Sequence, residues 1–119
     1  MTTEQIATRL VELVNTGQNI QAEEELYADN IHSYEQQPER NAIGKEAVIA
    51  KTNQSFELFI KVHEYQAKLV GLNNNSFMVE YLVDAELANG EAMKGREYAI
   101  YLVKDGQITD EYFFFTPDA

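Results

Sequence analysis

The chain has 119 residues, which is enough for one domain with a single core, so residues 1–119 are treated as one domain. Its 20 acidic residues against 9 basic ones give a net charge of −11, which disfavours binding to nucleic acid or to an anionic membrane surface. The absence of cysteine excludes thiol catalysis, disulfides and thiolate metal ligands. The polar N-terminus and the lack of a long apolar run predict a soluble, cytoplasmic protein.

An amphipathic helix is predicted at the start of the chain, over residues 3–16. Apolar residues recur there at the spacing of a one-faced helix, at Ile6, Leu10, Leu13 and Val14. Thr2 and Gln5 fit a capping box at the start of this helix, and Gly17 suits its end.

A second helix is predicted over residues 19–28, and the period of the sequence changes after it. We expect Ile20 and Leu26 to face the core and the run Glu23 to Glu25 to face solvent. From Ile31 to Glu35 the alternation is that of a strand. The next segment, QQPERNAIGKEA, is predicted to be a loop that leads into the third helix.

The third helix is predicted over residues 45–58, and the rest of the chain has the period of two that is typical of strands. One face of the helix carries Val48, Thr52, Phe56 and Phe59. The predicted strands cover residues 61–72, 76–88, 93–104 and 107–116, joined by the turn sequences NNNS, ANGEA and KDG. This order predicts an α+β fold, with three N-terminal helices packed on a curved, largely antiparallel sheet.

Several segments together resemble the nuclear transport factor 2-like superfamily, and within it the SnoaL-like branch, which is named after a polyketide cyclase. These segments are the first helix, LYADN near the end of the second helix, GKEAV at the start of the third, and VKDGQITDEYFFF at the end. The resemblance implies a cone-shaped fold with a deep pocket between the helices and the concave face of the sheet. It also implies a homodimer through the convex face. The fold hosts isomerases, dehydratases, cyclases, hydrolases and binders, so it implies no single activity.

Comparison with ketosteroid isomerase, a member of this superfamily, is informative where it fails. The stretch LYADNIHSYE resembles a stretch of that enzyme, and the general-base aspartate of the enzyme falls at the position of Glu35. Its oxyanion-hole tyrosine and acid would fall at Leu10 and Ala99, which cannot donate the required hydrogen bonds. Steroid isomerisation is therefore not expected.

Three glutamates and a tyrosine are the candidate catalytic residues. If Glu35 points inward, the alternation of the strands also turns Glu97, Tyr101 and Glu111 inward, so that three carboxylates share one cavity. Buried carboxylates that repel one another acquire raised pKa values and can serve as general acids or bases. The alternative is a register shifted by one residue, which would put the glutamates in water and Tyr98, Ile100 and Leu102 in the core.

The sequence predicts a pocket for a small apolar or amphipathic ligand, with no cofactor and no metal. His32 and His63 lie far apart and outside any metal-binding spacing, and no phosphate-binding loop or nucleophile elbow is present. Acid/base isomerisation, cyclisation or dehydration is one hypothesis. A non-catalytic ligand-binding module and a dimerisation module on the same fold are the alternatives.

A homodimer is predicted through the outer face of the sheet. With the glutamates inward, the opposite face carries a large apolar set made of Tyr98, Ile100, Leu102, Tyr112 and Phe114. Patches of this kind usually mark interfaces, and the same patch on two copies can pair about a two-fold axis.

Overall fold

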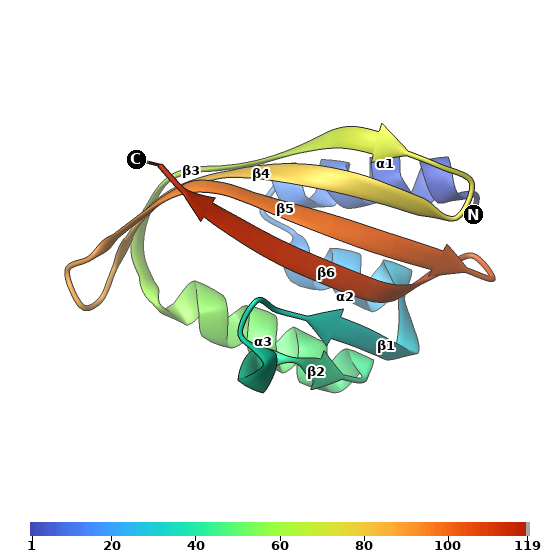
Figure 1. Ribbon diagram of the computed structural model, residues 1–119, viewed down its shortest axis with the longest axis horizontal. Coiled ribbons are helices and arrows are strands. Elements are labelled where there is room, and N and C mark those ends of the chain that lie inside the picture. Colours follow the sequence, from blue (N-terminus) through green and yellow to red (C-terminus); the bar gives the residue numbers. More distant parts are fainter. Residues whose placement is uncertain (119) are drawn as a thin grey trace.

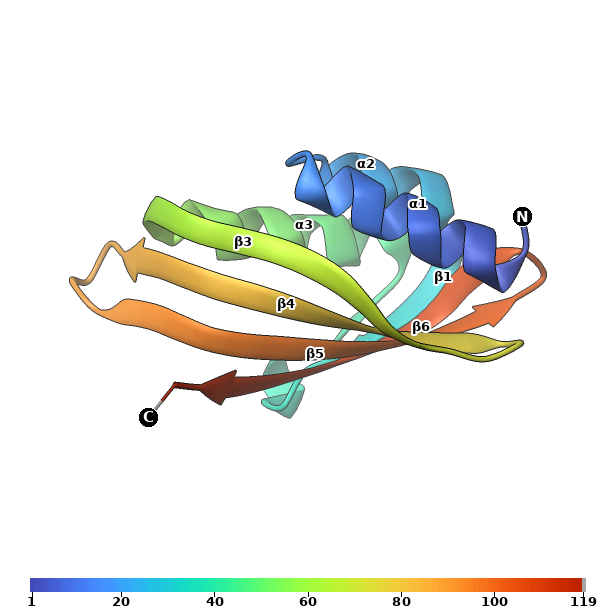
Figure 2. The ribbon, with the colours of Figure 1, turned by 90° about the horizontal axis from the view of Figure 1, so that it is seen from above.

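The computed structural model describes residues 1–118, with three helices packed on one six-stranded sheet (Figures 1 and 2). The helices are α1 (Thr3–Asn15), α2 (Asn19–Leu26) and α3 (Lys45–Glu57), with a short 3₁₀ helix at Pro38–Arg40. The strands are β1 (Tyr27–Tyr34), β2 (Ala42–Ile43), β3 (Phe59–Leu72), β4 (Ser76–Leu87), β5 (Ala92–Lys104) and β6 (Gln107–Pro117). The predicted α+β order of helices and strands is confirmed.

The sheet has the strand order β2-β1-β6-β5-β4-β3. Strands β3 to β6 form the predicted antiparallel meander, whereas β1 pairs with β6 in parallel. Strand β2 and the 3₁₀ helix lie inside the segment that was predicted to be a loop. The sequence did not indicate β2 because two residues are too few for an alternating pattern.

The sheet is curved, and all three helices lie on one of its faces (Figure 2), which we call the inner face. Strand β3 loses its regular register with β4 at three places along its length. Irregularities of this kind bend a strand and increase its twist. The bend leaves room between the middle of the sheet and the helices.

The ends of α1 have the predicted capping groups. The side-chain hydroxyl of Thr2 accepts a hydrogen bond from the Gln5 backbone N–H at 3.1 Å, and the Gln5 side chain accepts one from the Thr2 backbone N–H at 2.9 Å. At the other end Gly17 has φ = +76°, a conformation that glycine adopts without steric cost. An N-cap side chain such as that of Thr2 stabilises a helix by about 1 kcal/mol.

The core lies between α1, α2 and the inner face of the sheet. Ile6 and Leu10 of α1 are buried against a row of inward side chains on β4 that includes Val79 and Tyr81. On β5, Tyr101 is 1% exposed and Leu102 is 36% exposed, so the strand has the register that turns Tyr101 inward, and the shifted register is wrong. No helix within residues 1–118 is long and apolar enough to cross a membrane.

Candidate functional site

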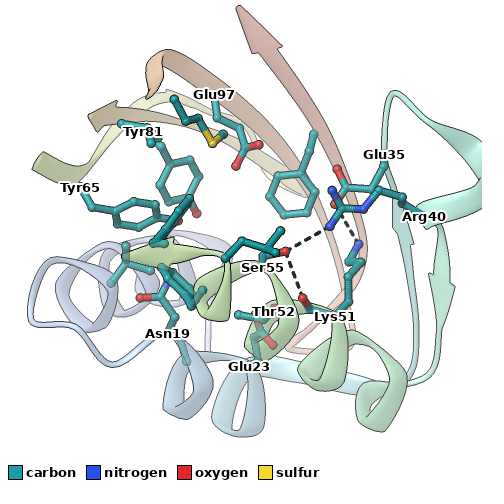
Figure 3. A pocket seen from close by; sticks show the side chains of 18 of the residues that line it. Asn19, Glu23, Glu35, Arg40, Lys51, Thr52, Ser55, Tyr65, Tyr81 and Glu97 are labelled. Atoms are coloured by element: carbon teal, nitrogen blue, oxygen red, sulfur yellow. Dashed lines mark hydrogen bonds and ion pairs between the residues drawn. The ribbon is translucent and has the colours of Figure 1, made fainter. Parts of the chain in front are cut away.

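A cavity of about 300 Å³ lies between the helices and the inner face of the sheet (Figure 3). Its volume is at the lower end of the range for small-molecule sites. Most of its wall is apolar, and the apolar lining residues include Leu10, Val14, Phe56, Phe59, Val83 and Met93. A few polar groups project into it, among them Glu23, Glu35, Arg40, Lys51 and Glu97. A mainly apolar wall with a few polar groups is typical of a ligand-binding site.

Glu35 lines this cavity directly after the last residue of β1. Its backbone N–H donates a hydrogen bond to Oδ1 of Asn41 at 2.8 Å, which ties the start of the following loop to its end. The side chain is 22% exposed, and its Oε1 lies 3.1 Å from Nζ of Lys51. Lys51 comes from α3 and also donates a hydrogen bond to the hydroxyl of Ser33. The Glu35 carboxylate is therefore oriented by a cation at the edge of the cavity.

Glu97 enters the cavity from β5 and is half-buried. Burial, followed by the negative charges of Glu35 and Glu111, raises the pKa of Glu97 to about 7. The charges of Lys51 and Arg40 act in the opposite direction. Near neutral pH a large fraction of Glu97 thus carries a proton that it can donate.

Glu111 of β6 is 1% exposed and lies behind the cavity lining, under Tyr27 and Ser33. The hydroxyl of Tyr27 donates to Oε1 at 2.6 Å, and the hydroxyl of Ser33 approaches Oε2 at 3.4 Å. Burial raises the pKa of Glu111 to about 7, although the hydrogen bond from Tyr27 and the charge of Lys51 partly oppose it. Ser33 contacts both Glu111 and Lys51, so it connects this buried carboxyl to the Glu35–Lys51 pair.

Tyr101 lines the cavity from β5, and its hydroxyl oxygen lies 2.5 Å from that of Tyr81. The ring stacks on Phe77 with a centroid distance of 4.8 Å and meets Phe113 edge to face. Burial raises the pKa values of both Tyr81 and Tyr101 well above the ordinary value, so both phenols are neutral. The two tyrosines form a rigid, hydrogen-bonded part of the wall.

Of the four residues singled out in the sequence, three thus line one cavity and the fourth, Glu111, lies behind its wall. Within residues 1–118 no group of three or more histidine, aspartate or glutamate side chains is placed to hold a metal ion. His63 instead contacts Glu86, with 2.7 Å between Nε2 and Oε2, at an exposed position on the sheet.

The expectation that Glu23 faces solvent is wrong, since its residue exposure is 7%. The hydroxyl of Thr52 donates a hydrogen bond to its Oε2 at 2.6 Å. Burial raises the pKa of Glu23 to about 8, with the Thr52 hydrogen bond opposing the shift. The burial of Glu23 could have been predicted from helical spacing, because Glu23 lies three residues before the buried Leu26 and next to the buried Ala22. The three consecutive glutamates obscured it.

Arg40 and Lys51 are the cationic residues of the site that the sequence reading missed. Lys51 lies three residues after Val48, on the predicted core face of α3. Arg40 reaches the cavity from the 3₁₀ helix and donates a hydrogen bond to Ser55 at 3.2 Å (Figure 3). No pattern in the sequence indicates that the loop carrying Arg40 folds against α3.

A curved sheet that encloses an apolar cavity against three helices defines a nuclear transport factor 2-like fold. The SnoaL-like domain family matches residues 1–115, and the chain belongs to this family. Among curated proteins none matches the sequence significantly.

Solved structures agree with this assignment. A candidate SnoaL-like polyketide cyclase of Mesorhizobium loti, also described as a carbohydrate phosphatase, is 34% identical with a TM-score of 0.87, and the match covers 96% of this chain and 99% of that one. A candidate SnoaL-like polyketide cyclase of Jannaschia sp. CCS1 is 16% identical, with a TM-score of 0.79 and coverage of 95% and 84%. A nuclear transport factor 2-like protein of unknown function from Burkholderia pseudomallei is 10% identical, with a TM-score of 0.75 and coverage of 96% and 90%. The last two likenesses show the fold alone.

Proposed function

We propose that this protein binds a small, mainly apolar ligand in the cavity and catalyses an acid/base reaction on it, such as an isomerisation, cyclisation or dehydration. The observation that supports this most directly is the presence of two carboxyl groups, Glu35 and Glu97, in the wall of one apolar cavity. Their surroundings differ, because Glu35 pairs with Lys51 whereas burial raises the pKa of Glu97 to about 7. Two titratable groups with different surroundings can divide the roles of base and acid.

In this proposal Glu35 is the general base and Glu97 is the proton donor. The Glu35 carboxylate takes a proton from a C–H bond of the ligand, and the bonding electron pair moves into the ligand. Glu97 delivers its proton elsewhere on the ligand, and exchange with solvent then returns both carboxyls to their starting states. Glu111 is the weaker candidate for donor because its carboxyl lies behind the wall, and we propose that Tyr101 shapes the cavity. Catalysis of this type contributes about 10²- to 10⁴-fold in rate.

The alternative is a non-catalytic binding module on the same fold. The same carboxyls and Arg40 would then act as hydrogen-bond partners for the polar end of an apolar ligand. Both descriptions of the Mesorhizobium loti relative, as a candidate polyketide cyclase and as a carbohydrate phosphatase, are of enzymes, which favours the catalytic proposal.

A titration with indane, a small apolar bicyclic hydrocarbon, tests the binding site without knowledge of the natural ligand. We expect the ¹H–¹⁵N NMR shifts to change mainly at lining residues such as Val83 and Met93. Replacement of half-buried Ser55 by tryptophan would obstruct the cavity and should abolish these shifts. Shifts spread over the outer face, or unchanged binding to the Ser55→Trp variant, would contradict the proposed site.

We also propose a two-fold homodimer through the outer face of the sheet. Phe114 is 46% exposed there, Leu102 is 36% exposed, and Tyr34 stacks on Tyr112 with a centroid distance of 4.6 Å. Exposed aromatic and aliphatic groups on neighbouring strands form a surface that favours association with a second copy.

A further inference from the structure

Arg40 lines the cavity and has no carboxylate partner. Within residues 1–118 it forms no ion pair, whereas Lys51, the other cation that lines the cavity, pairs with Glu35. The one hydrogen bond that its guanidinium gives to a described residue goes to Ser55. A guanidinium carries a planar fork of N–H donors, so most of the donors of Arg40 are left for a ligand or for water.

The contact between Ser55 and Arg40 has a defined direction. The Ser55 hydroxyl donates its hydrogen to the backbone oxygen of Lys51 at 3.0 Å. Toward Arg40 it can therefore only accept, and it does so from Nη2 at 3.2 Å. Arg40 is an exposed residue, yet this hydrogen bond turns its guanidinium toward α3 and the cavity rather than out into solvent (Figure 3).

The loop that carries Arg40 is held in place at two points. Its ends are joined by the hydrogen bond from the Glu35 backbone N–H to Oδ1 of Asn41 at 2.8 Å. Oε1 of Gln36 accepts a second one from the Phe115 backbone N–H at 2.7 Å, which attaches the loop to β6. The fold therefore fixes the guanidinium at the edge of the cavity, and a binding group that is already in position loses little freedom when a ligand arrives.

The charges around the cavity leave one positive charge unbalanced. Glu35 and Lys51 cancel each other as an ion pair. Burial raises the pKa values of the other carboxyls of the site to about 7 or 8, so at pH 6 they are mostly neutral. These carboxyls are Glu23, Glu97 and Glu111. The charge that remains is that of Arg40, and it suits a single anionic group.

We propose that Arg40 binds a carboxylate group of the ligand, so that the ligands of this cavity are small acids with an apolar body. This inference rests on the proposed function, since it concerns the same cavity. The planar guanidinium matches a carboxylate through two parallel hydrogen bonds. Such a contact would orient the ligand, with its carboxylate at the edge and its apolar body against Phe56, Phe59 and Val83. Arg40 would thus select the class of ligand, while the acid/base roles stay with the carboxyls.

A cationic ligand and a phosphate fit the same groups less well. The carboxylate of Glu35, which could attract a cation, is already paired with Lys51 at 3.1 Å. A phosphate monoester carries up to about two negative charges near pH 7, which exceeds the one unbalanced positive charge of Arg40. A carboxylate, with a single negative charge and a planar shape, matches both the charge and the geometry of the guanidinium.

The test compares 2-indanecarboxylate with the neutral 2-indanecarboxamide, which has nearly the same shape. The measured quantity is the ratio of the dissociation constant for the carboxamide to that for the carboxylate, at pH 6. Arg40→Gln should lower this ratio about tenfold, because a charge-assisted hydrogen bond is lost. Arg40→Lys keeps the charge without the planar fork and should lower the ratio by less. Lys104→Gln removes the same charge from an exposed position at the end of β5, outside the cavity wall, and should leave the ratio unchanged.

The side-chain Nε–H NMR signal of Arg40 gives a readout that an effect on folding alone would not move. Addition of 2-indanecarboxylate to wild type should shift this signal downfield, together with the backbone signals of Val83 and Met93 that respond to indane. The inference alone would be overturned if indane binds but the Nε–H signal stays in place, or if wild type and Arg40→Gln give the same ratio. Tighter binding of cationic 2-aminoindane than of the carboxylate would also overturn it. Failure of indane and all its derivatives to bind would overturn the proposed function as well.

Discussion

Nζ of Lys51 lies 3.1 Å from Oε1 of Glu35, and the same ammonium group donates to Ser33 below it. The contact fixes the Glu35 carboxylate at the edge of the cavity, since both partners are largely buried. A group that acts as a base must be held in a defined place. The contact also puts one positive charge among three carboxyls, those of Glu35, Glu97 and Glu111.

Replacement of Glu35 by glutamine should separate a catalyst from a binder. The amide keeps the shape of the side chain but cannot accept a proton, so turnover should fall by about 10²- to 10⁴-fold. Deuterium incorporation next to the carbonyl of 1-indanone in D₂O, followed by mass spectrometry, measures the proton removal. Indanone binding should change by less than about threefold, and Glu39→Gln, exposed on the neighbouring 3₁₀ helix, should leave exchange unchanged. Equal exchange by wild type and Glu35→Gln would leave only the binding role.

Replacement of Lys51 by methionine should raise the pKa values of Glu97 and Glu111 further. The Lys51 charge lowers the pKa of both groups, which are at about 7 in its presence. Carboxyl ¹³C NMR titration of the two variants Lys51→Met and Lys61→Met measures the change. Lys61 is exposed on β3, so its replacement should leave both titrations as they are in wild type. Unmoved titrations in Lys51→Met would show that the ammonium does not reach these carboxyls.

Glu111 should make the fold less stable as the pH rises. Its pKa is about 7 in the folded protein against an ordinary value of 4.5, so between these values the folded state binds more protons than the unfolded state. The free energy of unfolding therefore falls from about pH 4.5 to about pH 7 and gains no further slope from this group above that range.

Glu111→Gln removes this contribution, and urea unfolding at a series of pH values measures it. The decrease in unfolding free energy between pH 4.5 and pH 8 should be smaller in the variant by at least about 1 kcal/mol. Glu57→Gln, at the exposed end of α3, should follow the wild-type profile. A Glu111→Gln profile parallel to wild type would contradict the raised pKa.

Gly95 should not tolerate a side chain, because the backbone of the neighbouring strand β6 lies too close to it. A Cβ atom added there would lie 2.3 Å from the backbone oxygen of Thr116 and 2.8 Å from Cα of Pro117. We expect Gly95→Ala to lower the unfolding free energy by about 1 to 3 kcal/mol. Gly71 is the matched control, since its added Cβ would meet Cβ of Met78 at an ordinary 3.6 Å. Similar unfolding free energies for the two alanine variants would show that the sheet adjusts at Gly95.

Replacement of Phe114 by lysine should dissociate the proposed homodimer. Phe114 is 46% exposed on the outer face, and a charge there would have to be desolvated on association. Sedimentation should give about twice 13.6 kDa for wild type and 13.6 kDa for the variant at micromolar concentration. Ile43→Lys changes an exposed apolar residue of β2 outside the patch and should remain dimeric. A wild-type protein that sediments as a monomer would contradict the proposal directly.

The elements and faces of the fold were largely readable in the sequence, because periodicity reports burial. Alternation on β5 and β6 turned Tyr101 and Glu111 inward, and both are 1% exposed. The capping box of Thr2 and Gln5 follows from side-chain chemistry within four residues, which a sequence reports well.

The parts that escaped prediction depend on contacts between distant residues. Arg40 belongs to the site only because the loop after β1 folds against α3, where it meets Ser55. Glu23 looked like part of a solvated acidic run, although Thr52, 29 residues away, satisfies one of its oxygens. Whether Glu111 reached the cavity or lay behind it depended on the positions of Tyr27 and Ser33, which alternation does not give.

The parallel pairing of β1 with β6 has a consequence for the order of folding. Tyr27 and Glu111 are 84 residues apart in sequence, yet they share a buried hydrogen bond. The meander of β3 to β6 is built from neighbouring strands, so it can form through short loops. Strand β1 pairs with nearby β2 over two residues, and its pairing with β6 must wait for the last strand. During synthesis α1, α2 and β1 leave the ribosome well before β6. Until β6 arrives, the apolar face of these elements is open to other chains, and this interval is when aggregation competes most strongly with folding.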